Sequence, residues 1–327
     1  MNIKKIIPDN FILLLLLAII VGYFVPQLAT WQLGFINLDR IIDIGVVGVF
    51  FFYGLKLDKT QLKNDFRRWP VHLLTQSISF VLFPLLVLIF YPLFSKTEAY
   101  QMMFIGLFFL ASLPSTVSSS VVMVSIAKGN IISAIFNASL SGLIGIILTP
   151  LWMSIFTKST ASIDSSSVFI DLVIKILVPV MAGLFIQPWL EKFYQRHKFR
   201  IAKLDKLTII LIVYNSFAHT FHDGSFTLMQ PKQLILIAVC VSLLFFVVLK
   251  ISRWVGQKFG FSREDLITIQ FCGTKKSLVH GSVFASVLFS ENIGVYLLPI
   301  MIYHTFQLFI ISFIAVSYTH LTLPTTP

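Results

Sequence analysis

Hydroxyl side chains crowd around a proline inside a long apolar stretch of the sequence, Leu110–Ser125. Pro114 has no backbone N–H and clashes with the preceding turn, so a helix should break here and leave carbonyl oxygens free. Oxygen atoms of this kind bind hard cations, and Ser115 or Thr116 is also an expected N-cap for a second half-helix. A simple kink, with serines bonding their own helix, is the alternative. The candidate binding residues are Ser115, Thr116, Ser118, Ser119 and Ser120.

A second apolar stretch, Gln270–Phe284, carries the adjacent lysines Lys275 and Lys276. If the stretch spans a membrane, each lysine costs roughly 2.5–3.5 kcal/mol on insertion scales unless it is paired or hydrated. The lysines either lie near the interface and snorkel outward, or line a cavity, where they hold an anionic group or carry a coupling proton. Gln270 and Thr274, in the same break, are further candidates for binding.

A polar stripe follows the first break. Ser133, Asn137 and Ser141 recur at i, i+4 and i+8 and must share one helix face. The stripe could bind a ligand, or it could serve close helix packing through small residues. Gln76, in an earlier apolar stretch, is a further candidate for a cavity ligand.

The elements that must position these residues are membrane helices. With 57% hydrophobic residues, 12% charged residues and a mean hydropathy of +0.88, the chain is predicted to be an all-α polytopic membrane protein. Membrane helices need roughly 20 apolar residues each, and this length predicts about ten spans. The spans begin near Phe11, Leu38, Val71, Met102, Ile131, Val168, Leu204, Leu234, Glu264 and Ile293.

The net charge of +11 orients the chain and does not indicate a nucleic-acid partner. With a cytoplasmic amino terminus, most Lys and Arg residues fall in cytoplasmic connections, as the positive-inside rule requires. The opposite side holds only Arg40, Lys96, Lys158 and Lys232. We therefore expect a multi-pass protein of the plasma membrane, of the bacterial inner-membrane type, with both termini cytoplasmic. Membrane lipid is the expected surrounding partner, and the oligomeric state is left open.

Ten spans divide into two halves of five, and an odd number per half inverts the second half in the membrane. Each half carries its break in its fourth span, which is the layout of inverted repeats with paired discontinuous helices. The predicted organisation is a first repeat over 1–156, a linker over 157–167 and a second repeat over 168–316. The tail 317–327 differs sharply in composition and is predicted to be non-native.

Paired helix breaks of this kind predict a secondary active transporter with alternating access. No catalytic constellation, nucleotide loop or metal-spaced Cys/His cluster occurs, so an enzyme is not expected. The alternative is a membrane scaffold or regulator of another transport system that keeps the fold without transport. Dependence of a flux on Lys275 or Lys276 would distinguish the two.

Three segments resemble the bile acid:sodium symporter family, and its orphan branch in particular. They are Phe51–Pro70 (FFYGLKLDKTQLKNDFRRWP), the stretch from Leu113 to Pro150 (LPSTVSSSVVMVSIAKGN, then SGLIGIILTP) and Phe271–Leu278 (FCGTKKSL). The resemblance covers nearly the whole chain. It implies a panel and a core, with the fourth and ninth helices crossing at their breaks beside two sodium sites.

No cofactor is expected from the residues, and the resemblance, carried over by position, implies bound sodium. The implied ligands of the first sodium site are Ser118, Ser119, Ser120, Ser133 and Asn137. Gln76 falls near a ligand of the second site.

The sequence departs from the typical branch of that family at the ninth-helix break. An acidic residue and a Gln-Asn pair are typical there, whereas this chain has Phe271, Lys275 and Lys276. A fixed ammonium can occupy the space of a sodium ion. A small organic anion is therefore the expected substrate, with sodium coupling, proton coupling and uniport all open.

Overall fold

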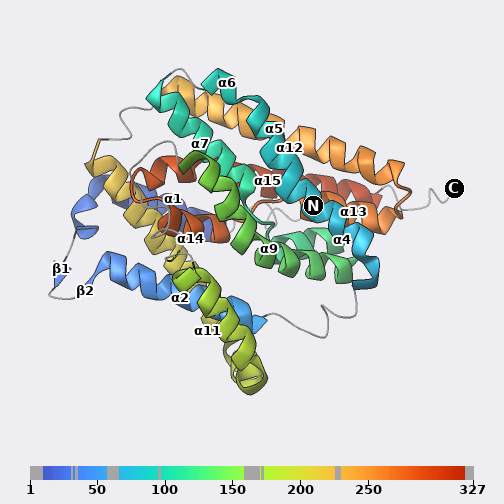
Figure 1. Ribbon diagram of the computed structural model, residues 1–327, viewed down its shortest axis with the longest axis horizontal. Coiled ribbons are helices and arrows are strands. Elements are labelled where there is room, and N and C mark those ends of the chain that lie inside the picture. The colour runs from blue at the N-terminus through green and yellow to red at the C-terminus, as the bar shows by residue number, and fades with distance from the viewer. Residues whose placement is uncertain are drawn as a thin grey trace. The chain divides into compact units, whose positions relative to one another are not determined.

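The computed structural model describes residues 10–30, 32–33, 36–56, 66–94, 97–157, 170, 173–224 and 230–320. Most of the predicted linker and residues 321–327 of the predicted tail lie outside these ranges. The described chain is almost entirely helical, apart from the short antiparallel strands β1 (Gln32–Leu33) and β2 (Ile36–Asn37). It is an all-helical polytopic membrane protein, as the composition predicts (Figure 1).

The chain forms two compact units, each assembled from separated segments. Unit 1 comprises Met1–Leu57, Ser162–Met229 and Ser282–Leu297, and unit 2 comprises Asp58–Ala161, Gln230–Gly281 and Leu298–Pro327. Each unit therefore draws on both halves of the chain. The division into two five-helix repeats cuts the chain differently and stays a prediction.

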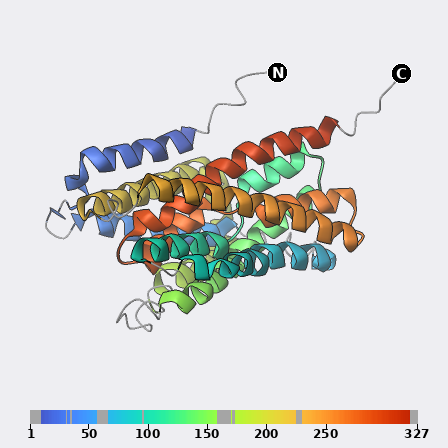
Figure 2. The same ribbon diagram turned by 90° about the horizontal axis from the view of Figure 1, so that it is seen from above.

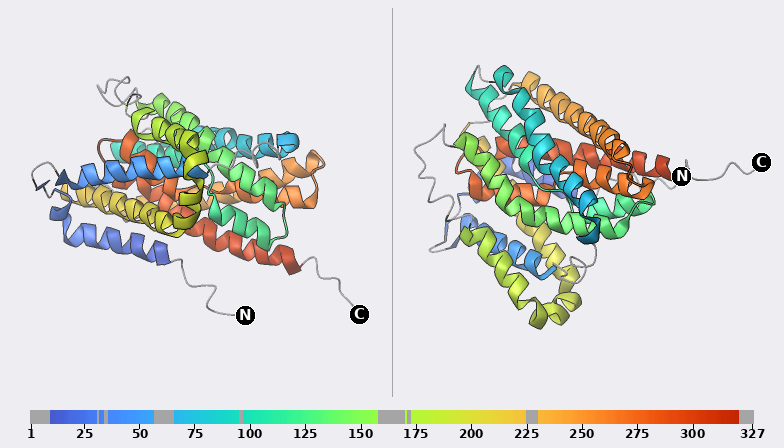
Figure 3. Two further views of the ribbon diagram at one scale, coloured as in Figure 1. Left: turned by 90° about the horizontal axis from the view of Figure 1, so that it is seen from below. Right: turned by 45° about the vertical axis from the view of Figure 1, so that its right-hand side comes forward.

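Unit 1 is built around three long helical segments. Its helices are α1 (Asn10–Phe24), η2 (Pro26–Leu28), α2 (Leu38–Lys56), the π-helical η5 (Val173–Leu177) and α11 (Val178–His222). Helix α11 contacts both α1 and α2, and α1 runs beside part of α11 in Figure 2 and in the left view of Figure 3.

Unit 2 carries both sequence breaks. Its helices are η3 (Phe66–Arg68), α4 (Trp69–Ser77), the π-helical η4 (Ile78–Leu82), α5 (Phe83–Ile89), α6 (Tyr91–Phe94), α7 (Glu98–Ser112), α8 (Ser118–Ile126), α9 (Ile131–Thr157), α12 (Pro231–Lys258) and α13 (Arg263–Thr274). Helices α12 and α13 pack side by side (Figure 2). Two further helices, α14 (Leu278–Leu288) and α15 (Ile293–His320), divide between the units.

Several predicted span starts are confirmed. Helices α2, α9 and α15 begin at the predicted residues Leu38, Ile131 and Ile293, and α1 begins at Asn10, one residue before the predicted Phe11. Five helices in the described part of the chain are long and apolar enough to cross a membrane. The number of ten spans stays a prediction.

The predicted separation of the sixth and seventh spans is wrong as a helix boundary. Helix α11 runs continuously for 45 residues and contains the basic stretch that was expected to connect the two spans. Its ribbon bends sharply partway along, and the helix continues through this change of direction (Figures 1 and 3). Loop composition alone did not reveal that the connection is helical.

Close backbone approach holds α2 against α11 in unit 1. A side chain at Gly54 would collide with the carbonyl of Val180, and one at Gly183 would collide with the carbonyl of Phe51. Small residues allow membrane helices to approach at backbone distance. The same unit pairs Lys175 with Asp43, whose atoms Nζ and Oδ1 lie 3.0 Å apart.

Two glycines of α2 provide a matched test of this packing. Gly54→Ala should lower the thermal midpoint, because overpacking a close contact costs about 1–3 kcal/mol. Gly48→Ala should leave the midpoint unchanged or raise it slightly, because nothing lies within 4 Å of its Cβ position and alanine favours the helix. Thermal unfolding of the purified protein in detergent measures both, and equal midpoints would contradict the packing.

Candidate functional site

Unit 2 brings the two interrupted helices together. The first interruption separates α7, which ends at Ser112, from α8, which begins at Ser118. The second separates α13, which ends at Thr274, from α14, which begins at Leu278. Both lie inside the apolar stretches that the sequence predicts to break. Residues in the interruptions adopt extended backbone, with Leu113 at ψ 152° and Lys275 at ψ 146°.

The two breaks hydrogen-bond directly to one another. The backbone N–H of Ser277 donates to the carbonyl of Pro114 over 2.9 Å. The hydroxyl of Ser115 donates to the carbonyl of Cys272 over 2.6 Å. Each break thus satisfies backbone groups that the other leaves without an intrahelical partner, which a membrane interior requires.

Pro114 explains why carbonyls are free at the end of α7. Its missing N–H removes the helical donor to Leu110, whose carbonyl instead accepts from Leu113 N over 3.3 Å. The N–H of Ser115 donates to Ser141 Oγ over 2.9 Å, which leaves the carbonyl of Ala111 without its helical donor. The predicted release of carbonyls around Leu110 and Ala111 is confirmed.

A π-helical turn frees another carbonyl in the third predicted span. In η4 the N–H of Phe83 donates to Ile78, five residues back, and so does not serve Ser79. The residue that would donate to Ser79 in the same pattern is Pro84, which has no N–H. The carbonyl of Ser79 therefore has no backbone donor of its own. Pro84 also leaves the carbonyl of Phe80 without its α-helical donor, and this carbonyl accepts from the indole N–H of Trp152 over 2.8 Å.

The ammonium of Lys276 lies where these free carbonyls converge. Its Nζ atom is 2.7 Å from the carbonyl oxygen of Ser79, 2.7 Å from that of Ala111 and 2.8 Å from that of Leu113. The ring centroid of Phe83 lies 4.3 Å from the same atom. Lys276 is 0% exposed, so it does not snorkel toward an interface. We call the three carbonyl oxygens the carbonyl cage.

The backbone of the second break is held from α15. Gln307 accepts from Lys276 N over 2.9 Å and donates to the carbonyl of Lys276 over 2.8 Å, as a neighbouring strand would. The hydroxyl of Tyr303 donates to the carbonyl of Thr274 over 2.6 Å. The extended backbone of the second break is therefore fixed in place by side chains from a distant helix.

Lys275 has far fewer contacts than its neighbour. It is also 0% exposed, and its ammonium makes a hydrogen bond of 2.8 Å to the carbonyl of Ser119 in the first turn of α8. No second acceptor and no carboxylate contacts it within the described ranges. Lys275 thus has a buried, sparsely coordinated side-chain amine.

Hydroxyls cluster beside Lys275 at the start of α8. Thr116 Oγ1 lies 2.7 Å from Ser120 Oγ, and Ser119 Oγ donates to Thr116 Oγ1 over 2.9 Å. The prediction that Ser115 or Thr116 caps this helix is wrong, because the N-cap is Val117 and no side chain caps the helix. Their hydroxyls make tertiary bonds instead. The side chain of Ser118 lies outside the described part of the structure.

The polar stripe of α9 meets Gln76. Its Nε2 atom donates to Asn137 at both the carbonyl and Oδ1, over 3.1 Å each, and Asn137 Nδ2 donates to the carbonyl of Ser133. Gln76 Oε1 and Ser133 Oγ are buried atoms without a hydrogen-bond partner. Among the described residues, no hydrogen bond joins this group to the hydroxyls of α8.

Gln270 and Thr274 are occupied by local and tertiary hydrogen bonds. Thr274 Oγ1 donates to the carbonyl of Gln270 over 2.6 Å. Gln270 donates to the carbonyl of Leu249 over 3.3 Å and accepts from the hydroxyl of Tyr318 over 2.8 Å. Neither side chain joins the contacts of Lys275 or Lys276.

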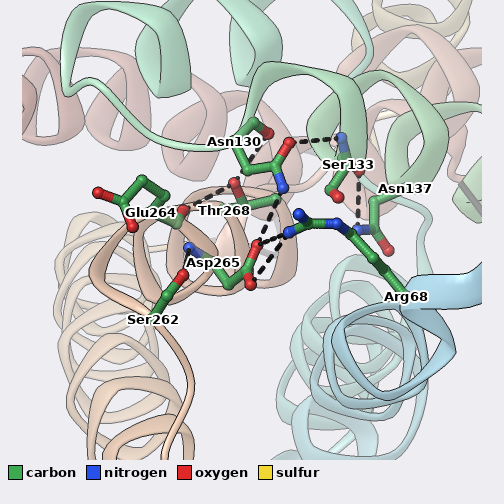
Figure 4. Close-up of polar contacts among 8 residues, drawn as sticks. All are labelled: Arg68, Asn130, Ser133, Asn137, Ser262, Glu264, Asp265 and Thr268. Atoms are coloured by element: carbon green, nitrogen blue, oxygen red, sulfur yellow. Dashed lines mark hydrogen bonds and ion pairs between the residues drawn. The ribbon is translucent and has the colours of Figure 1, made fainter.

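A cluster of charged and polar side chains surrounds the N-terminus of α13 (Figure 4). Arg68 Nη1 lies 3.0 Å from Asp265 Oδ1, which also accepts from Asn130 Nδ2 over 3.0 Å. Asn130 Oδ1 in turn accepts from the N–H of Ser133 over 3.1 Å, and Ser262 caps α13 through Asp265 N. The cluster links the starts of α4, α9 and α13. These helices carry Gln76, the polar stripe and the approach to the second break, so the cluster helps to position all three.

Sequence reasoning missed several residues that build the site. They are Arg68, Ser79, Asn130, Asp265 and Tyr303. Pro84 was the available signal for Ser79, because a second proline in a predicted span frees carbonyls as Pro114 does. Arg68, Asp265 and Tyr303 carry no local signal, since their contacts here are with segments far away in the sequence. Asn130 lies directly before α9 and accepts from the N–H of Ser133, three residues on, as a helix N-cap does.

Comparison with known proteins finds one matching family and several relatives that cover most of the chain. A model of the SBF-like CPA transporter family matches residues 9–320. The Pseudomonas aeruginosa protein named "Uncharacterized protein PA2026" is 32% identical over 97% of this chain and 95% of its own length. The Escherichia coli K12 protein named "Putative symporter YfeH" is 31% identical over 95% of this chain and 92% of its own. A Xenopus tropicalis protein named "Sodium/bile acid cotransporter 7" is 28% identical over 82% and 79%.

Alanine substitution of two serines distinguishes a pair of breaks that hydrogen-bond to one another from a simple kink. Ser115→Ala should lower stability by about 1–3 kcal/mol, because the buried carbonyl of Cys272 loses its donor. Ser154→Ala should have little effect, because that hydroxyl bonds the carbonyl of Leu151 in its own helix, at an exposed position. Thermal unfolding in detergent compares the variants. Equal, small effects would favour a kink whose serines bond locally.

Proposed function

Because the chain belongs to the SBF-like CPA transporter family, we propose that it is a secondary active transporter of a small organic anion, which binds at Lys275. Relatives named as symporters or cotransporters support transport as the general activity. The family membership also bears out the resemblance predicted from FCGTKKSL and its companion segments. A transporter family is consistent with the expectation that the protein is not an enzyme.

The coordination of Lys275 is the observation that carries the proposal. A buried ammonium without a counter-charge is costly, and the described residues supply Lys275 with one backbone acceptor. In unit 1, by contrast, the membrane lysine Lys175 pairs with Asp43. An anionic substrate would provide the charge that the protein omits around Lys275.

The start of α8 adds hydrogen-bond donors beside this charge. The N-cap of α8, Val117, makes no side-chain hydrogen bond, and the positive end of the helix dipole favours an anion. Ser119, whose carbonyl binds Lys275, is partly exposed, and the preceding Val117 is 39% exposed. In this proposal a carboxylate or sulfonate approaches along this side, with Thr116, Ser119 and Ser120 orienting it.

The coupling ion is proposed at the polar stripe of α9. Gln76 Oε1 and Ser133 Oγ are buried without partners, and an unpaired buried oxygen costs about 1–3 kcal/mol. Neutral oxygens suit a sodium ion, which Gln76, Ser133 and Asn137 could hold there, with Ser118, Ser119 and Ser120 as the further ligands that the resemblance implies. Proton coupling and uniport are the competing modes.

The predicted architecture belongs to the same proposal. Two inverted five-helix repeats, arranged as a panel and a core, would give two breaks in equivalent positions and would let each compact unit draw on both halves of the chain. The two breaks lie together in one unit, which supports this arrangement. The proposed location is the plasma membrane, with both termini in the cytoplasm.

A membrane scaffold or regulator is the alternative function. It would keep the crossing breaks as structure and would need no substrate charge at Lys275. The sparse coordination of that ammonium favours transport, because a purely structural lysine would be expected to have acceptors like those of Lys276.

Uptake into proteoliposomes tests the proposal, with radiolabelled succinate and taurocholate as probes. Wild type should accumulate at least one probe, under a sodium or a proton gradient. Lys275→Gln should lose uptake at least about tenfold, because a hydrogen bond to a buried charge contributes about 1.5–3 kcal/mol.

Lys250→Gln, at an exposed position of α12, is the matched control and should retain wild-type uptake. Comparing the two gradients identifies the coupling ion. If folded wild type and Lys275→Gln both match protein-free liposomes, the transport proposal fails and the scaffold becomes the better account.

A further inference from the structure

The carbonyl cage around Lys276 has the composition of a site for a monovalent cation. Its oxygens belong to the backbone carbonyls of Ser79, Ala111 and Leu113, at 2.7–2.8 Å from Nζ. They are neutral, and the rings of Phe83 and Phe80 face the same ammonium at 4.3 and 5.8 Å. Carbonyl oxygens that replace a hydration shell are how proteins bind bare monovalent cations, and aromatic faces add attraction.

The cage exists for reasons that do not involve the lysine. Ser79 loses its donor to the π-helical turn and to Pro84, while Ala111 loses its donor because Ser115 N–H is directed to Ser141. Leu113 lies in extended backbone beyond the end of α7. Removal of the Lys276 side chain would therefore leave three buried carbonyls still facing the same point.

We infer that the crossing of the two broken helices forms a binding site for a monovalent cation of ammonium or potassium size, which this chain fills with the ammonium of Lys276. Three acceptors at these distances use all three N–H donors of a protonated amine. The tether makes the cation permanent, so the crossing is complete without an ion from solution.

One consequence rests on the proposed function. If the protein transports an anion at Lys275, the charge beside the crossing stays with the protein through the cycle. No free cation is then needed at the cage, and any coupling ion must bind elsewhere, at the α9 stripe for example. Occupancy of the cage itself does not depend on transport.

Cation-dependent stability of Lys276→Ala tests the inference. The thermal midpoint of the purified full-length protein is measured in detergent with chloride salts of methylammonium, potassium, sodium or choline at equal ionic strength. In choline, which is too large to enter, the variant should unfold well below wild type. Methylammonium should raise its midpoint by at least about 2 °C, potassium should follow, and sodium, the smallest ion, should act least.

Lys275→Ala is the matched control, because it removes an equally buried lysine that has no cage. Wild type and Lys275→Ala should show no preference for methylammonium or potassium. If folded Lys276→Ala has the same midpoint in all four salts, or if Lys275→Ala responds like Lys276→Ala, the inference is overturned.

A second variant keeps the test decisive if Lys276→Ala does not fold. Lys276→Met fills the volume of the side-chain stem but donates nothing to the cage, so its midpoint should fall further below wild type than that of Lys275→Met. A Lys276→Met protein as stable as wild type would overturn the inference, since the cage would have lost its cation without cost. Uptake is not part of either readout, so failure here leaves the transport proposal to be judged separately.

Discussion

Free backbone carbonyls in a membrane interior must find donors, and this constraint organises unit 2. Pro114 and the π-helical turn before Pro84 release carbonyls that no helix can satisfy. The ammonium of Lys276 binds three of them at once, and hydrogen bonds between the two breaks satisfy others. The two interrupted helices are therefore held together by one buried cation and the backbone it binds.

The adjacent lysines have different roles because their surroundings differ. Lys276 is surrounded by acceptors and is part of the framework, while Lys275 reaches a single carbonyl in the first turn of α8. A rigid crossing places Lys275, the uncapped start of α8 and its hydroxyls on a fixed scaffold. Such preorganisation is useful in a binding site, because the protein does not have to order these groups when the substrate arrives.

Local chemistry made parts of this arrangement predictable from the sequence. Pro114 followed by hydroxyls, and two lysines in an apolar stretch, marked both breaks, and the spacing of Ser133, Asn137 and Ser141 marked the inner face of α9. The pairing of Lys276 with Ser79 could not be predicted, because it depends on a π-helical turn and on contacts across nearly 200 residues. Arg68 pairs with Asp265 across a similar separation, whereas Gln307 and Tyr303 act across 31 and 29 residues. The helical connection inside α11 was also missed, because its basic composition resembles that of a loop.

The most direct measurement locates a heavy monovalent cation in crystals of Lys276→Ala. Thallium and rubidium ions are close to potassium in size and can be identified by anomalous scattering. A peak should lie among the carbonyl oxygens of Ser79, Ala111 and Leu113, and wild-type crystals soaked in the same way should show none there. A cage that keeps its geometry in the variant but holds no ion would contradict the claim that Lys276 takes the place of a bound cation.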